Sequence, residues 1–186
     1  LLKYGVENKD YINENDYSES DLMYYEPPLI EDLNKGGIEG KHFFSYYKKW
    51  IPQENYYYAS ENTGFVANKF RSEGTYSKYA SLDDKTDGFH YYMSLIKFGL
   101  GRATSDAAHE IREKHITRDE AKVLIEKYDE EFPIKYFQEF LDYIDINDEQ
   151  FNNILDKFRK KSSHLWKQVN NEWKLKHNVN GTGVED

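Results

Sequence analysis

Residues 82–115, LDDKTDGFHYYMSLIKFGLGRATSDAAHEIREKH, are the stretch that decides the fold class. Apolar and aromatic residues recur in it at helical spacing, and a pair of glycines interrupts the pattern once. The pattern predicts one helix over 82–98 and a second over 104–114. Ser81 and Asp84 have the spacing of a loose capping box, so we expect the first helix to be capped by Ser81.

Helical signals continue on both sides of this stretch. A proline suited to a first turn, and polar residues suited to capping, mark the starts of further helices. The helices predicted from these signals cover 52–62 (ending before Gly64), 118–129 (capped by Thr117), 133–144 (opened by Pro133), 149–161 (capped by Asn147 or Asp148) and 165–176.

The N-terminal quarter gives weaker signals. Residues 1–40 are rich in polar and turn-forming residues, and the aromatic run at 42–51 predicts either a short strand or the start of a buried helix. Residues 65–80 are ambiguous, with a turn expected at Gly74. The sequence therefore predicts a mainly α protein with an irregular region at 1–40, a helical domain at 41–180 and a loose tail at 181–186.

Composition excludes several function classes. The 186-residue chain has a formal net charge of -9, which disfavours nucleic-acid binding because phosphate contacts need a basic face. It contains no cysteine, so thiolate catalysis and cysteine-based zinc sites are excluded within it. No run of about 18 apolar residues and no signal peptide is present, so we expect a cytoplasmic protein without a membrane partner.

A polar stripe runs along the first predicted helix. At about 100° per residue, its five members fall within about 80° of one another. Aromatic and aliphatic residues cover most of the remaining surface, which indicates a helix buried on most sides. The stripe is then a solvent face with intrahelical pairs, a functional cleft, or a metal site that uses its two aspartates and its histidine. The stripe consists of Asp83, Asp87, His90, Ser94 and Lys97.

Further charged residues lie close to this stripe in the sequence. Arg102, Asp106 and Glu110 share one helix face, where they either form an ion-pair ladder or extend the cleft. Lys97 and Arg102 flank the FGLGR turn, where two cations and a flexible backbone could hold phosphate oxygens. A second pair of cations, Arg71 and Lys78, lies just upstream. The pair either binds an anion or belongs to a solvated loop. The turn alone is not a specific phosphate motif.

Two long stretches resemble the C-terminal half of the N-acetyl sugar amidotransferase family. They run from PPLIEDLNKGGIEGKHFF at 27–44 through ENTGF at 61–65, and from RSEGTYSKYASLDDK at 71–85 through IEKYD at 125–129. The resemblance covers roughly residues 5–177. It implies a role in pseudaminic or legionaminic acid pathways, used in flagellin modification, or in lipopolysaccharide O-antigen pathways.

The family belongs to the PP-loop ATP pyrophosphatases, whose α/β nucleotide domain carries a Ser-Gly-Gly-x-Asp-Ser loop. That loop is absent from this sequence. The resemblance therefore implies the helical C-terminal portion of a longer PP-loop enzyme, inactive alone. Residues 1–40 would then be a linker or an edge of the missing nucleotide domain.

The implied reaction is ATP-dependent adenylation of an acetamido sugar, followed by attack of ammonia to give an acetamidino group. It implies ATP and Mg²⁺ as cofactors, and glutaminase and cyclase-like subunits as the ammonia source. The alternatives are a non-catalytic helical docking module for those subunits and a metal-binding helical protein. We expect catalytic phosphate-side cations at Lys97 and Arg102, sugar-acid or phosphate contacts at Arg71 and Lys78, and substrate-binding or orienting roles at Asp83, Asp87, His90 and Asp106.

Overall fold

The computed structural model describes residues 18–22, 28–38, 40 and 42–179. The chain divides into two compact units, residues 1–49 and residues 50–186. Residues 1–17 of the predicted irregular region and the predicted tail at 181–186 lie outside the described residues. In the first unit the described elements are α2 (Glu19–Leu22), α3 (Ile30–Lys35) and the 3-10 helix η2 (Phe44–Tyr46).

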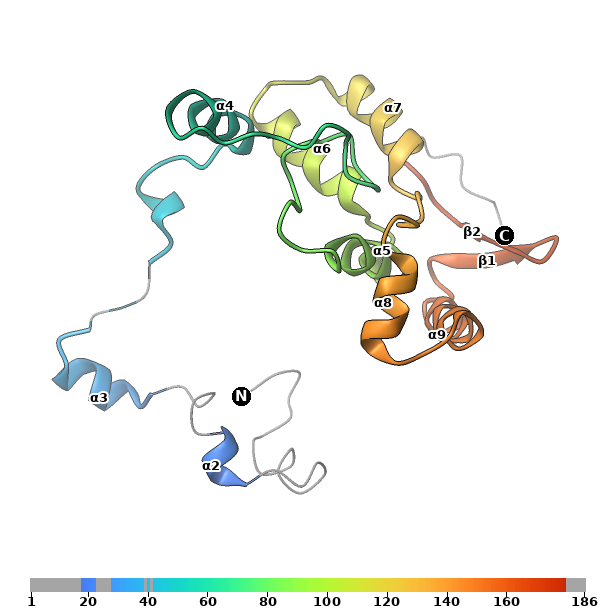
Figure 1. Ribbon diagram of the computed structural model, residues 1–186, viewed down its shortest axis with the longest axis horizontal. Coiled ribbons are helices and arrows are strands. Elements are labelled where there is room, and N and C mark those ends of the chain that lie inside the picture. Colours follow the sequence, from blue (N-terminus) through green and yellow to red (C-terminus); the bar gives the residue numbers. More distant parts are fainter. Residues whose placement is uncertain (1–17, 23–27, 39, 41, 180–186) are drawn as a thin grey trace. The chain divides into compact units, whose positions relative to one another are not determined.

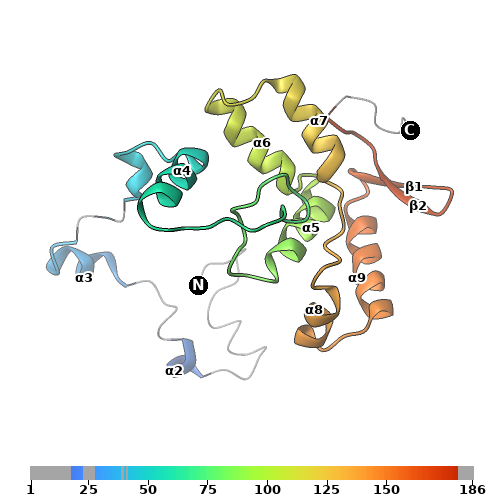
Figure 2. The ribbon, with the colours of Figure 1, turned by 45° about the horizontal axis from the view of Figure 1, so that its top comes forward.

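The second unit is a helical domain that ends in a small hairpin, which confirms the predicted mainly α class (Figure 1). Helix α6 packs against α7, while α5 packs against α6 and α9. In Figure 2 the hairpin follows α9 and lies on the opposite side of this domain from α4. The elements are α4 (Pro52–Asn62), α5 (Asp87–Phe98), α6 (Arg102–Arg112), α7 (Arg118–Tyr128), α8 (Phe137–Ile144), α9 (Asp148–Lys161), β1 (Trp166–Val169) and β2 (Glu172–Leu175).

Capping chemistry fixes several helix starts as predicted. Pro52 occupies the first turn of α4. Thr117 forms a reciprocal capping box with Glu120 at the start of α7, and Asn147 forms one with Gln150 at the start of α9. Each box satisfies backbone N–H groups that a helix end otherwise leaves without partners.

The core is an aromatic cluster between α5, α8 and α9. The Phe89 ring stacks on that of Phe140 with 4.0 Å between centroids, and Phe151 meets it edge-on at 6.5 Å. Phe132 and Phe137 complete the cluster. Aromatic pairs of this kind add about 0.5–1.5 kcal/mol each beyond the area that they bury. The cluster therefore anchors α5, which carries part of the predicted polar stripe.

Three helix starts differ from the prediction by two residues or more, and the smallest difference is that α6 begins at Arg102 rather than Thr104. Helix α5 begins at Asp87, not after Ser81, and α8 begins at Phe137, four residues after Pro133. Ser81 adopts a left-handed backbone conformation with φ of 56°, and its hydroxyl bonds Asp87 and Arg102. The Ser81 oxygen is thus used in tertiary contacts and leaves the first N–H groups of α5 uncapped.

The predicted helix over 165–176 is wrong, because this segment is an antiparallel hairpin. Strands β1 and β2 pair with Trp166 opposite Leu175 and Val169 opposite Glu172. Asn170 and Asn171 both have positive φ, 54° and 67°, as a tight two-residue hairpin turn requires. The Trp166 indole N–H also donates to the carbonyl of Ile96 at 2.8 Å, which ties the hairpin to α5.

The aromatic run at 42–51 is neither a strand nor buried. It contains η2, and Phe43, Phe44, Tyr46, Tyr47 and Trp50 are all exposed, by 62% to 82%. None of the described helices is both long enough and apolar enough to cross a bilayer.

Candidate functional site

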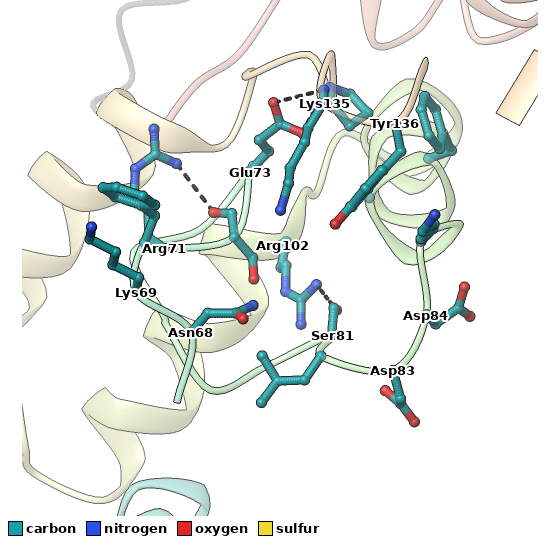
Figure 3. Close-up of a pocket in the computed structure, with 17 residues that line it drawn as sticks. Asn68, Lys69, Arg71, Glu73, Ser81, Asp83, Asp84, Arg102, Lys135 and Tyr136 are labelled. Carbon is teal, nitrogen blue, oxygen red and sulfur yellow. Dashed lines mark hydrogen bonds between the residues drawn. The ribbon is translucent and has the colours of Figure 1, made fainter. Parts of the chain in front are cut away.

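A cavity of about 450 Å³ opens beside the N-terminus of α5 (Figure 3). We call it the cationic cavity, because five basic side chains line it against three acidic ones. This balance contrasts with the net charge of -9 of the whole chain. The basic residues are Lys69, Arg71, Lys85, Arg102 and Lys135, and the acidic ones are Glu73, Asp83 and Asp84.

Arg71 clamps the loop that forms one wall of the cavity. Its guanidinium donates to both carboxylate oxygens of Glu131 at 2.6 Å, and one nitrogen also reaches the carbonyl of Thr75 at 3.1 Å. Glu131 in turn accepts the backbone N–H of Gly74 at 2.8 Å. The bond from Arg71 holds the pKa of Glu131 below its usual value. The Arg71 guanidinium therefore already donates most of its hydrogen bonds to other groups of this chain.

Arg102 is the buried centre of the site and is only 5% exposed. Its guanidinium donates to the Ser81 hydroxyl and, at 3.2 Å, to Asp87; its Nε lies 3.8 Å from the carboxylate of Asp106. It also lies 4.4 Å from the centre of the Tyr91 ring. Figure 3 shows it between the loop that carries Ser81 and the segment from Asn68 to Glu73.

The FGLGR turn holds an internal carboxylate. The backbone N–H of Gly101 donates to Asp129 at 2.9 Å, and the N–H and hydroxyl of Thr104 both donate to it at 2.8 Å. Asp129 is buried and thus occupies the anion position at the N-terminus of α6. A Cβ at Gly101 would approach Asp129 to 2.7 Å, so this glycine permits the close contact. The N–H groups that a phosphate would need at this turn are already engaged.

Two lysines of the cationic cavity differ from its arginines. Lys69 and Lys135 have no carboxylate within 4.0 Å in the part of the chain that the structure describes, whereas Lys85 pairs with Glu139 at 2.5 Å. The Lys135 ammonium lies 4.6 Å from the centre of the Tyr136 ring, and its backbone N–H donates to Glu73 at 3.1 Å. These two ammonium groups are the ones that remain available to an anionic ligand.

The structure brings together some of the predicted site residues and separates others. Arg71, Asp83 and Arg102 line the cationic cavity, and Asp87 contacts it through its bond to Arg102. Lys97 and His90 are exposed on α5 and are not part of the cavity lining. The Lys97 ammonium lies 5.6 Å from the centre of the Phe158 ring. Lys78 and Asp106 line a separate groove, described below.

Sequence analysis did not single out Lys69, Lys135 or Tyr136. Lys69 and Lys135 are 66 positions apart, and no local spacing links them. The loop clamped by Arg71 and Glu131 is what brings the two segments to one cavity.

The predicted metal alternative finds no support in the described residues. Among them, no group of three His, Asp or Glu side chains has the geometry to hold a metal ion. The Asp87 carboxylate, one member of that alternative, is bonded to Ser81 and Arg102 instead.

Comparison with known proteins gives a family for this domain. The model of the family described as LPS biosynthesis protein WbpG-like, C-terminal domain, matches residues 73–180, which is more than half of the 186 residues. No curated protein matches the chain. The matched range contains helices α5 to α9, the hairpin and most of the cationic residues of the cavity, and it agrees with the resemblance found in the sequence. The chain therefore belongs to the WbpG-like C-terminal domain family of lipopolysaccharide biosynthesis proteins, the C-terminal half of an N-acetyl sugar amidotransferase family.

Proposed function

We propose that this chain is the C-terminal part of an ATP-dependent N-acetyl sugar amidotransferase, and that its cationic cavity binds the acetamido sugar substrate. The product would be an acetamidino sugar for O-antigen or flagellin glycans. Membership in a lipopolysaccharide biosynthesis family supports the pathway, and the cavity supports the substrate class.

In this reaction the acetamido oxygen attacks the α-phosphorus of ATP, and pyrophosphate leaves. Ammonia then adds to the activated carbon, the carbon–oxygen bond breaks so that AMP departs with the former acetamido oxygen, and loss of protons from the added nitrogen leaves an acetamidino group. The chain's own contribution is to bind and orient the sugar, because holding reactants in position lowers the entropic part of the barrier.

The observation that carries this proposal is the pair of lysines in the cationic cavity without carboxylate partners among the described residues. Lys69 and Lys135 line the same cavity as Arg102, whose Nε makes no hydrogen bond within the described residues. Cations that are not neutralised internally attract carboxylate or phosphate groups of a ligand. We assign the phosphate-side or acid-side role to Lys69 and Lys135, and a positioning role to Arg102.

The cavity also offers apolar surface for the uncharged part of such a substrate. Phe89 and Pro133 lie in its wall, and Tyr136 presents both a ring and a hydroxyl group. Gly88 lies against Pro133, since a Cβ at this position would come within 2.9 Å of the proline. Sugar-binding sites combine such apolar walls with a few polar groups that fix orientation.

ATP and Mg²⁺ enter this proposal through the remainder of the enzyme. The phosphate-gripping loop is absent from the sequence, and the described residues offer no three-ligand metal group. A glutaminase with a cyclase-like subunit would supply the ammonia.

Sugar-dependent exchange between ATP and pyrophosphate, measured on the longer enzyme that contains this segment, tests the proposal. We expect exchange that requires an acetamido sugar and that falls strongly in a Lys69→Ala, Lys135→Ala double variant. The double variant Lys160→Ala, Lys161→Ala removes two exposed lysines of α9 and serves as the charge-matched control. No exchange in a folded enzyme supplied with candidate sugars would contradict the proposal.

The exposed aromatic run favours a second candidate function, a docking module for the ammonia-supplying subunits. Phe43, Phe44, Tyr46 and Tyr47 expose large apolar surfaces of the kind enriched at protein interfaces. Co-purification with a glutaminase and cyclase-like pair, lost on Phe43→Ser, Phe44→Ser substitution while exchange persists, would favour this function.

A further inference from the structure

A second hollow lies between the start of α4, the loop at 76–80 and α6. Its inner part is a cavity of about 100 Å³, which widens into an outer groove of about 610 Å³. The two parts share six lining residues, so we treat them as one acidic groove. The shared residues are Gln53, Tyr76, Ser77, Tyr79, Glu110 and His115.

The inner cavity has an acidic floor. Asp106 and Glu110 lie on one face of α6, Glu113 is the residue that follows its last turn, and all three line the cavity. Burial raises the pKa of Asp106 and of Glu110, because removing a carboxylate from water disfavours its charged form. Asp106 accepts a hydrogen bond from the Thr75 hydroxyl at 2.5 Å and lies 3.8 Å from the Arg102 guanidinium. Two histidines, His109 and His115, line the inner cavity, and Lys78 lines the outer groove.

Tyrosine rings form the walls. Tyr56 stacks on Tyr79 with 4.5 Å between centroids and 9° between planes, and the Tyr79 hydroxyl donates to Gln53 at 2.9 Å. The Tyr76 hydroxyl oxygen is fully buried and lies close to the Glu110 carboxylate. Burial, together with the charges of Glu110 and Asp106, raises the pKa of Tyr76 and raises that of Tyr79 to about 12. Both tyrosines thus stay protonated in a negative field.

A site built from carboxylates and tyrosine rings favours some kinds of cation over others. A divalent metal needs several ligands at short, fixed distances, and no group of three carboxylates or histidines in the described residues provides them. Aromatic faces beside carboxylates suit a weakly hydrated ammonium group instead, through cation–π attraction and hydrogen bonds. The inner volume of about 100 Å³ admits a small ion.

We propose that the acidic groove is a binding site for ammonium or a small primary amine, held by Glu110 and Asp106 and by the rings of Tyr76 and Tyr79. The further identification of this ion with the nitrogen donor of the reaction rests on the proposed function. Arg102 lines the cationic cavity and Asp106 lines the acidic groove, so their contact separates the two hollows.

A titration of the complete ¹⁵N-labelled chain with ammonium chloride, followed by NMR, tests the site without any turnover. Potassium chloride at equal ionic strength is the control salt, because potassium has a similar size but donates no hydrogen bonds. We expect saturable shifts confined to residues 76–80 and 106–115 with ammonium only. Glu110→Gln should weaken binding about tenfold, as loss of one charged contact in a partly buried site does. Glu149→Gln, an exposed carboxylate of α9, should bind as the wild type does.

Tyr76→Phe is a second variant that keeps the ring and removes only the buried hydroxyl, and it should weaken binding by a smaller factor. No saturable shift in the folded chain, or an equal response to potassium, would overturn the proposal. Ammonium binding without ATP–pyrophosphate exchange would leave this site standing and remove the amidotransferase function. ATP–pyrophosphate exchange without ammonium binding would support the amidotransferase function and overturn the ammonium site.

Discussion

The cationic cavity and the acidic groove lie on two sides of a single side-chain contact, yet they have opposite charge. Arg102 lines the first and Asp106 lines the second, with 3.8 Å between their charged atoms. The first offers two lysines without carboxylate partners in the described residues, and the second offers raised-pKa carboxylates beside tyrosines. The net charge of -9 describes neither hollow, so ligand preference in this domain is set locally.

The largest expected effect comes from removing the contact that separates them. Arg102→Ala would leave Asp87 and Asp106 without their cation in a largely buried setting and would release Ser81. We expect a loss of about 3 kcal/mol in the free energy of unfolding, the scale found when one partner of a buried ion pair is removed. Urea denaturation measures it. Arg112→Ala on the exposed end of α6 is the control, and equal stability of the two variants would refute the structural role of Arg102.

The next effect concerns the cationic cavity alone. Lys69→Ala and Lys135→Ala should each weaken binding of the anionic sugar about 10- to 100-fold, because a hydrogen bond to a charged group is worth about 1.5–3 kcal/mol. Both lysines are exposed, so unfolding midpoints should stay at the wild-type value. Substrate titration of the longer enzyme gives the affinity. An unchanged affinity in the double variant would remove the cavity as the sugar site.

Lowering the pH should change the contributions of Glu131 and Glu110 to the free energy of unfolding in opposite directions. Glu131 has a pKa lowered by its bond to Arg71, so its stabilising effect is present above the unfolded value of 4.5 and is lost as pH falls through the lower folded value. Glu110 has a pKa raised by burial, so its charged form opposes folding near neutrality and that cost disappears on protonation.

Glu131→Gln should therefore destabilise the chain at pH 7 and converge with the wild type in acid. Glu110→Gln should be neutral or stabilising at pH 7, with the same convergence in acid. Free energies of unfolding measured from pH 7 down to below the lowered folded pKa of Glu131 provide the comparison. Destabilisation of the same sign in both variants at pH 7 would show that the two hollows do not differ electrostatically as described.

The smallest expected effect is that of Lys97→Ala. Sequence analysis placed Lys97 among the phosphate-side cations, but it is exposed on α5 and is absent from the lining of the cationic cavity. Turnover of the longer enzyme should change less than about twofold, in the range of surface substitutions away from a site. A loss comparable to that of Lys135→Ala would restore Lys97 to the active site.

Helix positions were predictable wherever a local signal decided them. Pro52, Thr117 and Asn147 act on backbone groups within one turn, so their spacing in the sequence is enough. Ser81 is also a residue type that caps helices and has a capping-box spacing, but its hydroxyl contacts the Arg102 side chain, 21 positions away. The hairpin was missed because a short alternating segment ending in Asn170 and Asn171 also contains helix-forming residues.

The sequence by itself determined the helical class, most of the capping, the family resemblance and the absence of cysteine chemistry, since these depend on residue identity and short spacing. Only the tertiary structure decided which charges remain available. Asp129 fills the turn where a phosphate was expected, and Glu131 engages Arg71, whereas Lys69 and Lys135 keep no carboxylate partner in the described part of the chain. Hydrogen bonds and ion pairs act through space over a few ångströms, and here they join Gly101 to Asp129 over 28 positions and Arg71 to Glu131 over 60 positions. The two lysines that share the cavity lie 66 positions apart in the sequence.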